Sequence, residues 1–247
     1  MRTGAIAALL WKETRQIGRN RMALLTATFL PFIILLVAPI QLLIQFKLVG
    51  ARGFDPTSTA FPGFADLGDP LALLVGFIYP MLFVLGGLLL PGLTTTYAIV
   101  AERERRSLEL LISLPVSVSE ILTAKLLAVL LVTALVGLPY VAVVLTLLLV
   151  LGVADAGSVP ALLVPFAAAV TCSTALSLLL TLLARDFRTA NNLNGAFFVP
   201  ILILTLATMS LVGGSARTYV LSAVLLALAG LALAIALRWI SFERYLD

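Results

Sequence analysis

Apolar runs long enough to cross a lipid bilayer occupy most of this 247-residue chain. A membrane-spanning helix needs roughly 20 consecutive, mainly apolar residues. Six stretches meet that requirement: residues 22–46, 71–99, 121–151, 159–184, 195–212 and 218–240. Hydrophobic residues make up 62% of the chain, against roughly 45–50% in ordinary soluble domains. We therefore predict an all-α, polytopic membrane protein whose six transmembrane helices form a single domain over residues 1–247.

The distribution of Lys and Arg predicts the orientation of these spans, because basic residues concentrate in cytoplasmic connections. Four basic segments fall on one side of a six-span topology: residues 1–21, 101–125, 185–188 and 238–244. The other side holds only Lys47, Arg52 and Arg217 of the 16 Lys and Arg. We expect a multi-pass protein of the cell membrane with both termini in the cytoplasm. Because the charge is divided among apolar runs, no nucleic-acid partner is expected.

The chain lacks the residues on which most enzymes and metal sites depend. It has no His and a single Cys, Cys172, which lies inside an apolar run. The lysines are Lys12, Lys47 and Lys125, and none ends a glycine-rich phosphate-binding loop. We therefore predict no catalytic, cofactor-binding or metal-ligating residue, and ATP, if used, must be hydrolysed by another chain.

One segment between the second and third spans, "AERERRSLELLISLPVSVSE" at 101–120, concentrates charge in an otherwise apolar protein. Leu108, Leu111 and Ile112 recur at the i, i+3 and i+4 spacing of an amphipathic helix. Pro115 disfavours helical geometry in the residue before it, and Ser117 with Glu120 forms a capping box for the next helix. These features predict a cytoplasmic elbow over residues 101–119, with a short amphipathic helix followed by a sharp bend.

A solvated loop that merely satisfies the positive-inside rule is the competing interpretation of this segment. That rule concerns Lys and Arg only. The segment also carries four carboxylates, at Glu102, Glu104, Glu109 and Glu120. We therefore favour a protein-binding elbow over a solvated loop.

These residues resemble the segment between the second and third spans in the membrane-spanning permease subunits of type-2 ABC transporters. That family carries Glu-Arg-Glu-x-Gly-Thr-Leu-Glu, then a Leu-Leu pair, a Pro and a Lys. The matching positions are Glu102, Arg103, Glu104, Leu108, Glu109, Leu110, Leu111, Pro115 and Lys125. Arg106 and Ser107 stand where the family usually has Gly and Thr. Six spans, cytoplasmic termini and a basic amphipathic helix over residues 1–21 extend the resemblance to essentially the whole chain.

The resemblance implies that the elbow is a coupling helix that docks into a separate ATPase subunit, which binds ATP and Mg. It implies two such ATPases and a second membrane subunit, identical or related. The expected ATPase interface comprises Glu102, Arg103, Glu104, Arg106, Leu108, Glu109, Leu111 and Ile112. Export is the favoured direction, because the outer connections are short.

Inside the spans, the resemblance suggests a substrate path lined by Phe77, Phe83, Phe197 and Phe198, since the second and fifth spans often line the dimer interface of that family. Phenylalanines that face lipid are the competing interpretation. Small polar residues near one face of the fourth span favour helix packing over a substrate path: Thr171, Thr174, Ser177 and Thr181. We also predict that Asn192 or Asn194 caps the fifth span.

Two other function classes fit the sequence less well. An ion- or proton-driven secondary carrier would normally hold ionisable residues at midspan, and none lies there. An intramembrane hydrolase would need a nucleophile with a base, yet the chain has no His, and Lys125 lies near the membrane edge. Both are alternatives to the ATP-driven permease subunit that the sequence favours.

Overall fold

The computed structural model describes residues 10–12, 14–15, 28–48, 69–104, 118–184 and 187–239, and among these residues it contains helices and no strand. The elements are η1 (Ile33–Val37), α3 (Ala38–Leu48), α4 (Pro70–Leu73), η4 (Leu74–Ile78), α5 (Tyr79–Glu104), α7 (Val118–Val150), α8 (Ser158–Leu183), α9 (Phe187–Leu211) and α10 (Ala216–Trp239). The symbol η here marks a π-helical stretch. Within these ranges, six helices are long and apolar enough to cross a membrane. The predicted all-α protein with six spans is therefore confirmed.

Two helix ends differ from the boundaries of the apolar runs. α5 continues to Glu104, so its last turn includes Glu102 and Arg103. α9 begins at Phe187, which places Asn192 and Asn194 inside the helix. The prediction that one of these asparagines caps the fifth span is therefore wrong. An apolar run marks the part of a helix that lies in hydrocarbon, whereas the hydrogen-bonded helix extends into polar residues at the membrane edge.

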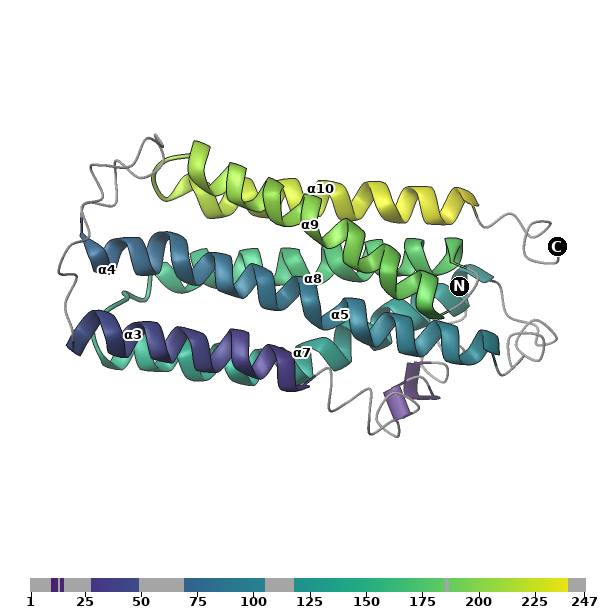
Figure 1. Cartoon of the computed structure of the whole chain (residues 1–247), viewed down its shortest axis with the longest axis horizontal. Helices are drawn as coiled ribbons and strands as arrows, with labels where there is room; N and C mark the ends of the chain where they lie inside the picture. The colour runs from purple at the N-terminus through teal and green to yellow at the C-terminus, as the bar shows by residue number, and fades with distance from the viewer. Residues whose placement is uncertain are drawn as a thin grey trace.

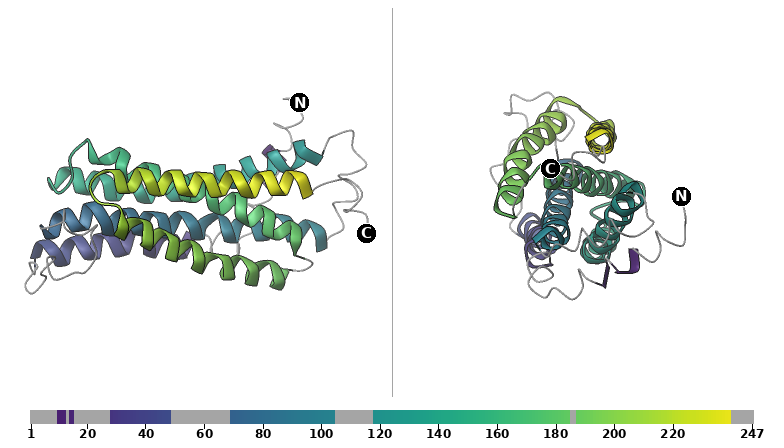
Figure 2. Two further views of the ribbon diagram at one scale, coloured as in Figure 1. Left: turned by 90° about the horizontal axis from the view of Figure 1, so that it is seen from above. Right: turned by 90° about the vertical axis from the view of Figure 1, so that its right-hand side faces the viewer.

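The six spans form three layers of two helices (Figure 1). α5 and α8 occupy the middle layer, with α9 and α10 on one side and α3 and α7 on the other, as the end-on view also shows (Figure 2). One core cluster joins the middle layer to α9 and α10, and a second joins it to α7 and the first span. α8 is the most enclosed span: 72% of the residues in its apolar stretch, 158–183, are buried within the bundle.

Small residues allow α5 and α8 to pack closely along the middle layer. A Cβ added at Gly87 would lie 3.0 Å from the backbone oxygen of Phe166 and 3.1 Å from the Cβ of Ala169. Ser173 of α8 donates a hydrogen bond to the carbonyl oxygen of Leu88 in α5. Close backbone approach and interhelical hydrogen bonds hold membrane helices together where hydrophobicity cannot. The small residues therefore determine which two spans form the centre of the bundle.

The hydroxyls of α8 mostly bond within their own helix. Thr174 donates to the carbonyl oxygen of Val170 at 2.7 Å, and Thr181 donates to that of Ser177. Both threonines are buried between helices. Their burial agrees with the favoured interpretation of these residues as packing residues, which stays a prediction.

The first two spans share an unusual backbone pattern next to a proline. The N–H of Ala38 donates to the carbonyl oxygen of Ile33, five residues back, and Pro39 follows. The N–H of Tyr79 donates in the same way to Leu74, and Pro80 follows. Proline removes an N–H and its ring crowds the preceding turn, and single π-helical turns are one way in which a helix accommodates such a disturbance. The hydroxyl of Tyr79 donates to the carbonyl oxygen of Pro39 at 3.1 Å, which links the two disturbed segments.

Candidate functional site

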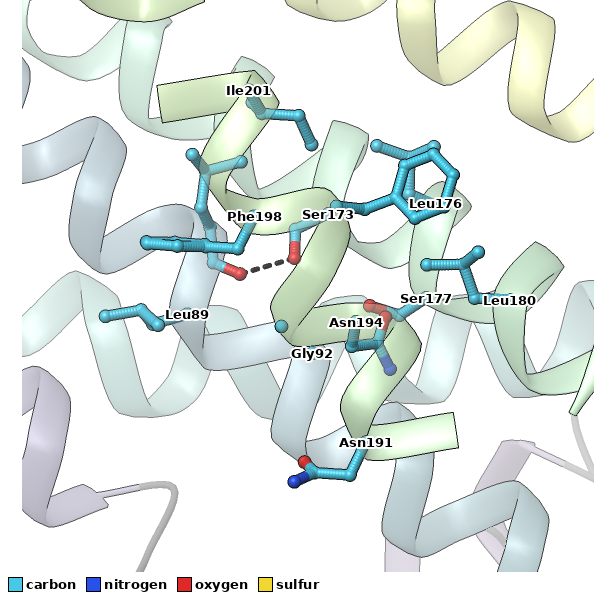
Figure 3. A pocket seen from close by; sticks show the side chains of 13 residues that line it. Leu89, Gly92, Ser173, Leu176, Ser177, Leu180, Asn191, Asn194, Phe198 and Ile201 are labelled. Carbon is cyan, nitrogen blue, oxygen red and sulfur yellow. Dashed lines mark hydrogen bonds between the residues drawn. The ribbon is translucent and has the colours of Figure 1, made fainter. Parts of the chain in front are cut away.

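A cavity of about 230 Å³ lies between α5, α8 and α9 (Figure 3). Its walls are mainly apolar and include Leu88, Leu176, Phe198 and Ile201. α9 is the span with the smallest buried share, 17% of its apolar stretch. The cavity is therefore bordered by the two central helices on one side and by a peripheral helix on the other.

Three uncharged polar side chains lie at one end of this cavity. Ser177 projects from α8 and is 3% exposed, whereas Asn191 and Asn194 come from the early turns of α9. Asn191 is exposed and Asn194 is half-buried. Gly92 of α5 lies opposite Ser177, where an added Cβ would approach the Ser177 Oγ to 3.6 Å. The absence of a side chain at Gly92 keeps this end of the cavity open.

The four phenylalanines predicted to line a substrate path are divided between different environments. Phe197 and Phe198 of α9 both line the cavity. Phe77 packs against the core cluster formed by α5, α8, α9 and α10. Phe83 is fully buried in the second core cluster, where its ring stacks on Tyr79 with the ring centroids 6.4 Å apart. The structure therefore brings two of the four together at the cavity.

The predicted ATPase interface lies only partly within the described residues. Glu102, Arg103 and Glu104 occupy the last turn of α5, whereas Arg106, Leu108, Glu109, Leu111 and Ile112 lie outside the part of the chain that the structure describes. The apolar stretch of the second span ends at Gly92, and α5 continues for 12 more residues to Glu104. These 12 residues extend the helix by about 18 Å at 1.5 Å per residue. α7 begins at Val118, directly after the predicted capping residue Ser117, which is itself outside the described residues.

The basic segment at the start of the chain is described only at Leu10–Lys12 and Thr14–Arg15, all of which are helical. The guanidinium carbon of Arg15 lies 5.1 Å from the centre of the Trp11 ring, and both side chains are exposed. A cation over an indole ring is a favourable contact. This pair is the kind of surface that an interfacial helix presents to lipid headgroups.

Sequence reasoning missed the residues that shape the polar end of the cavity. Asn191 was not singled out, and Ser177 was considered only as a packing residue. The signal that was present is the spacing of Ser173 and Ser177, which puts two small hydroxyl residues on one face of α8. Among the residues that the structure describes, no three His, Cys, Asp or Glu side chains are placed to hold a metal ion.

Comparison with protein families gives a match over most of the chain. The family model described as ABC-2 family transporter protein matches residues 7–219. No curated protein and no solved structure matches the chain. The matched range includes the cavity, the charged segment after the second span and the first five spans.

Proposed function

The chain belongs to the ABC-2 family of transporter proteins, and on that premise we propose that it couples export to a separate ATPase subunit through residues 102–115. It is a multi-pass membrane protein and a permease subunit of an ABC transporter. In the proposed complex, two ATPase subunits bind ATP and Mg, and this chain works with a second membrane subunit, identical or related.

The continuity of α5 is the observation that supports this proposal most directly. One helix carries Leu88 and Gly92 at the cavity and Glu102 to Glu104 at the far end. α5 contains Pro91 but continues past it as one helix to Glu104, and such a helix transmits a displacement of its end to the turns beside the cavity. Movement of an ATPase against the elbow would therefore move one wall of the cavity, because α5 is that wall.

The outer connections support export over uptake. Residues 151–157 join α7 to α8, residues 212–215 join α9 to α10, and the longest outer connection, residues 49–69, joins α3 to α4. These lengths leave little surface on which a solute-binding receptor could dock. An exporter takes its substrate from the cytoplasm or the membrane and needs no such receptor.

The exposed face of α9 supports a second membrane subunit. Phe197, Leu204 and Leu211 recur every seven residues and therefore share one face of the helix; they are 46%, 36% and 68% exposed, and Phe197 also lines the cavity. A second membrane subunit that covers this face would complete the wall of the path. The four predicted phenylalanines then have different roles, with Phe197 and Phe198 on the path and Phe77 and Phe83 supporting it.

The coupling proposal is tested with a double substitution in the elbow. Leu108→Ala with Leu111→Ala removes two anchors, which at a well-packed interface are worth about 2 kcal/mol or more each, roughly a thirtyfold loss of affinity apiece. We expect the ATPase to be lost on co-purification and its stimulation by the permease to disappear, with normal insertion and expression. Reversal of charge by Glu104→Lys or Glu109→Lys should mainly reduce association and specificity.

The matched control is Leu226→Ala with Leu231→Ala on α10, where the two leucines are 48% and 60% exposed in the bundle and face away from the core. This pair should leave ATPase binding unchanged. If the elbow variant binds and stimulates the ATPase as well as the control does, residues 102–115 are not the coupling element.

A further inference from the structure

The cavity between α5, α8 and α9 changes character along the direction of the membrane normal. Its polar end consists of Ser177, Asn191 and Asn194. Its apolar wall continues along α9 to Ile201, about 15 Å from Asn191 at 1.5 Å per residue. The polar end lies at the end of the bundle where α5 terminates and α9 begins (Figure 1), which the positive-inside rule predicts to be cytoplasmic.

The hydroxyl of Ser177 is available to a ligand. The Ser177 side chain lines the cavity, whereas its carbonyl oxygen accepts from Thr181. Ser173, one turn earlier, instead donates to Leu88. Ser177 is 3% exposed at the cavity wall facing Gly92, and a hydroxyl can both donate and accept a hydrogen bond. A ligand with a hydrogen-bonding group at this end of the cavity would lie beside it.

The lining defines the charge and the size of that ligand. Within the described part of the chain, no Asp, Glu, Lys or Arg lines the cavity, and a charged group buried there would lack a counterion. The volume of about 230 Å³ accommodates a small polar head with part of one hydrocarbon chain.

We propose that this cavity binds an uncharged amphiphile, with a hydroxyl or amide head at the polar end and one hydrocarbon chain along the apolar wall. The ligand enters from the leaflet on the side where α9 begins, because the polar end lies there. This inference rests on the proposed function, since it assigns a ligand class to the path of that permease. Binding is nevertheless measurable without an ATPase.

The test uses the full chain in phosphatidylcholine vesicles and a monoacylglycerol with a photoreactive diazirine in its acyl chain. We expect saturable labelling that maps to α5, α8 or α9. A fatty acid and an alkylamine with the same chain, both ionised, should label at least tenfold less. Equal labelling by the charged probes, or labelling confined to other helices, overturns the proposal.

Substitutions test the geometry of the site. Gly92→Leu places a side chain in the polar end and should abolish labelling, whereas its matched control Gly230→Leu lies in open space on α10 and should leave labelling unchanged. Ser177→Ala, which adds no bulk, should lower the affinity for the probe roughly three- to tenfold, the effect of one hydrogen bond. Labelling of Gly92→Leu and Ser177→Ala at the wild-type level would refute the assigned site.

Adding the ATPase subunit and ATP shows whether the bound amphiphile is transported cargo or a bilayer lipid that stays in the site. Loss of label during ATP hydrolysis identifies transported cargo, and label that is unaffected by ATP identifies a bilayer lipid held in the site. A chain that binds the probe but does not bind an ATPase contradicts the proposed function alone. A chain that couples to the ATPase but is not labelled contradicts this inference alone.

Discussion

Substituting Gly87 by Ala tests whether the close approach of α5 and α8 holds the bundle together. The added Cβ would meet the backbone oxygen of Phe166 at 3.0 Å and the Cβ of Ala169 at 3.1 Å, inside the 3.4 Å at which ordinary van der Waals contact begins. One of these neighbours is backbone and the other is a Cβ, so neither can rotate away. The two helices must therefore separate by a few tenths of an ångström.

Two opposing effects determine the change in stability. Overpacking a close contact costs about 1–3 kcal/mol, whereas replacing Gly by Ala in a helix gains about 0.5–1 kcal/mol. We expect Gly87→Ala to lower the free energy of unfolding by about 1–2 kcal/mol. The same change at Gly230, where an added Cβ meets no atom within 4 Å, should raise it by about 0.5–1 kcal/mol.

The assay is SDS-titrated unfolding in mixed micelles, read by pulse proteolysis, with both variants measured beside the wild-type chain. The diagnostic result is opposite signs for the two substitutions. If Gly87→Ala is as stable as Gly230→Ala, the contact between α5 and α8 is not tight, and the assignment of these helices as the centre of the bundle is wrong.

Two further predictions concern the disturbed first two spans and the topology. Tyr79→Phe removes the hydrogen bond to the carbonyl oxygen of Pro39. It should destabilise the protein by about 0.6 kcal/mol in the same SDS titration, the average for such bonds in a membrane protein. The control is Tyr219→Phe, at a tyrosine that is 47% exposed; an equal loss of stability in both variants would show that the bond is unimportant. In a cysteine-free background, Asp155→Cys should react with an impermeant thiol reagent from outside intact cells and Arg188→Cys only from inside. Labelling of Arg188→Cys in intact cells would contradict the predicted orientation.

The number of spans was readable from the sequence because it is a local property. A run either is or is not long enough to cross hydrocarbon. Pro115 and Ser117, on which the predicted start of the third long helix rests, lie outside the described residues, so that prediction stays open. The family resemblance also came from contiguous residues, and the match over residues 7–219 confirms it.

The partners of each helix face were decided only by the tertiary structure. In soluble proteins, an apolar stripe predicts the buried face. Here lipid is as apolar as the protein interior, so both sides of a span carry Leu, Val and Phe. Phe83 lies in a core and Phe197 is 46% exposed, yet nothing in the surrounding sequence distinguishes them.

The cavity could not be predicted from the sequence for the same reason. It lies where α9 meets the α5–α8 pair, and the close approach within that pair depends on the small residues near Gly87 and on the hydrogen bond from Ser173 to Leu88. Spacing along one chain places Ser177 on a helix face but does not determine the rotation of that face toward another helix. The sequence by itself determined which segments lie in the membrane, whereas only the packing of the helices decided which side chains meet, because the hydrophobic effect does not distinguish a neighbouring helix from lipid.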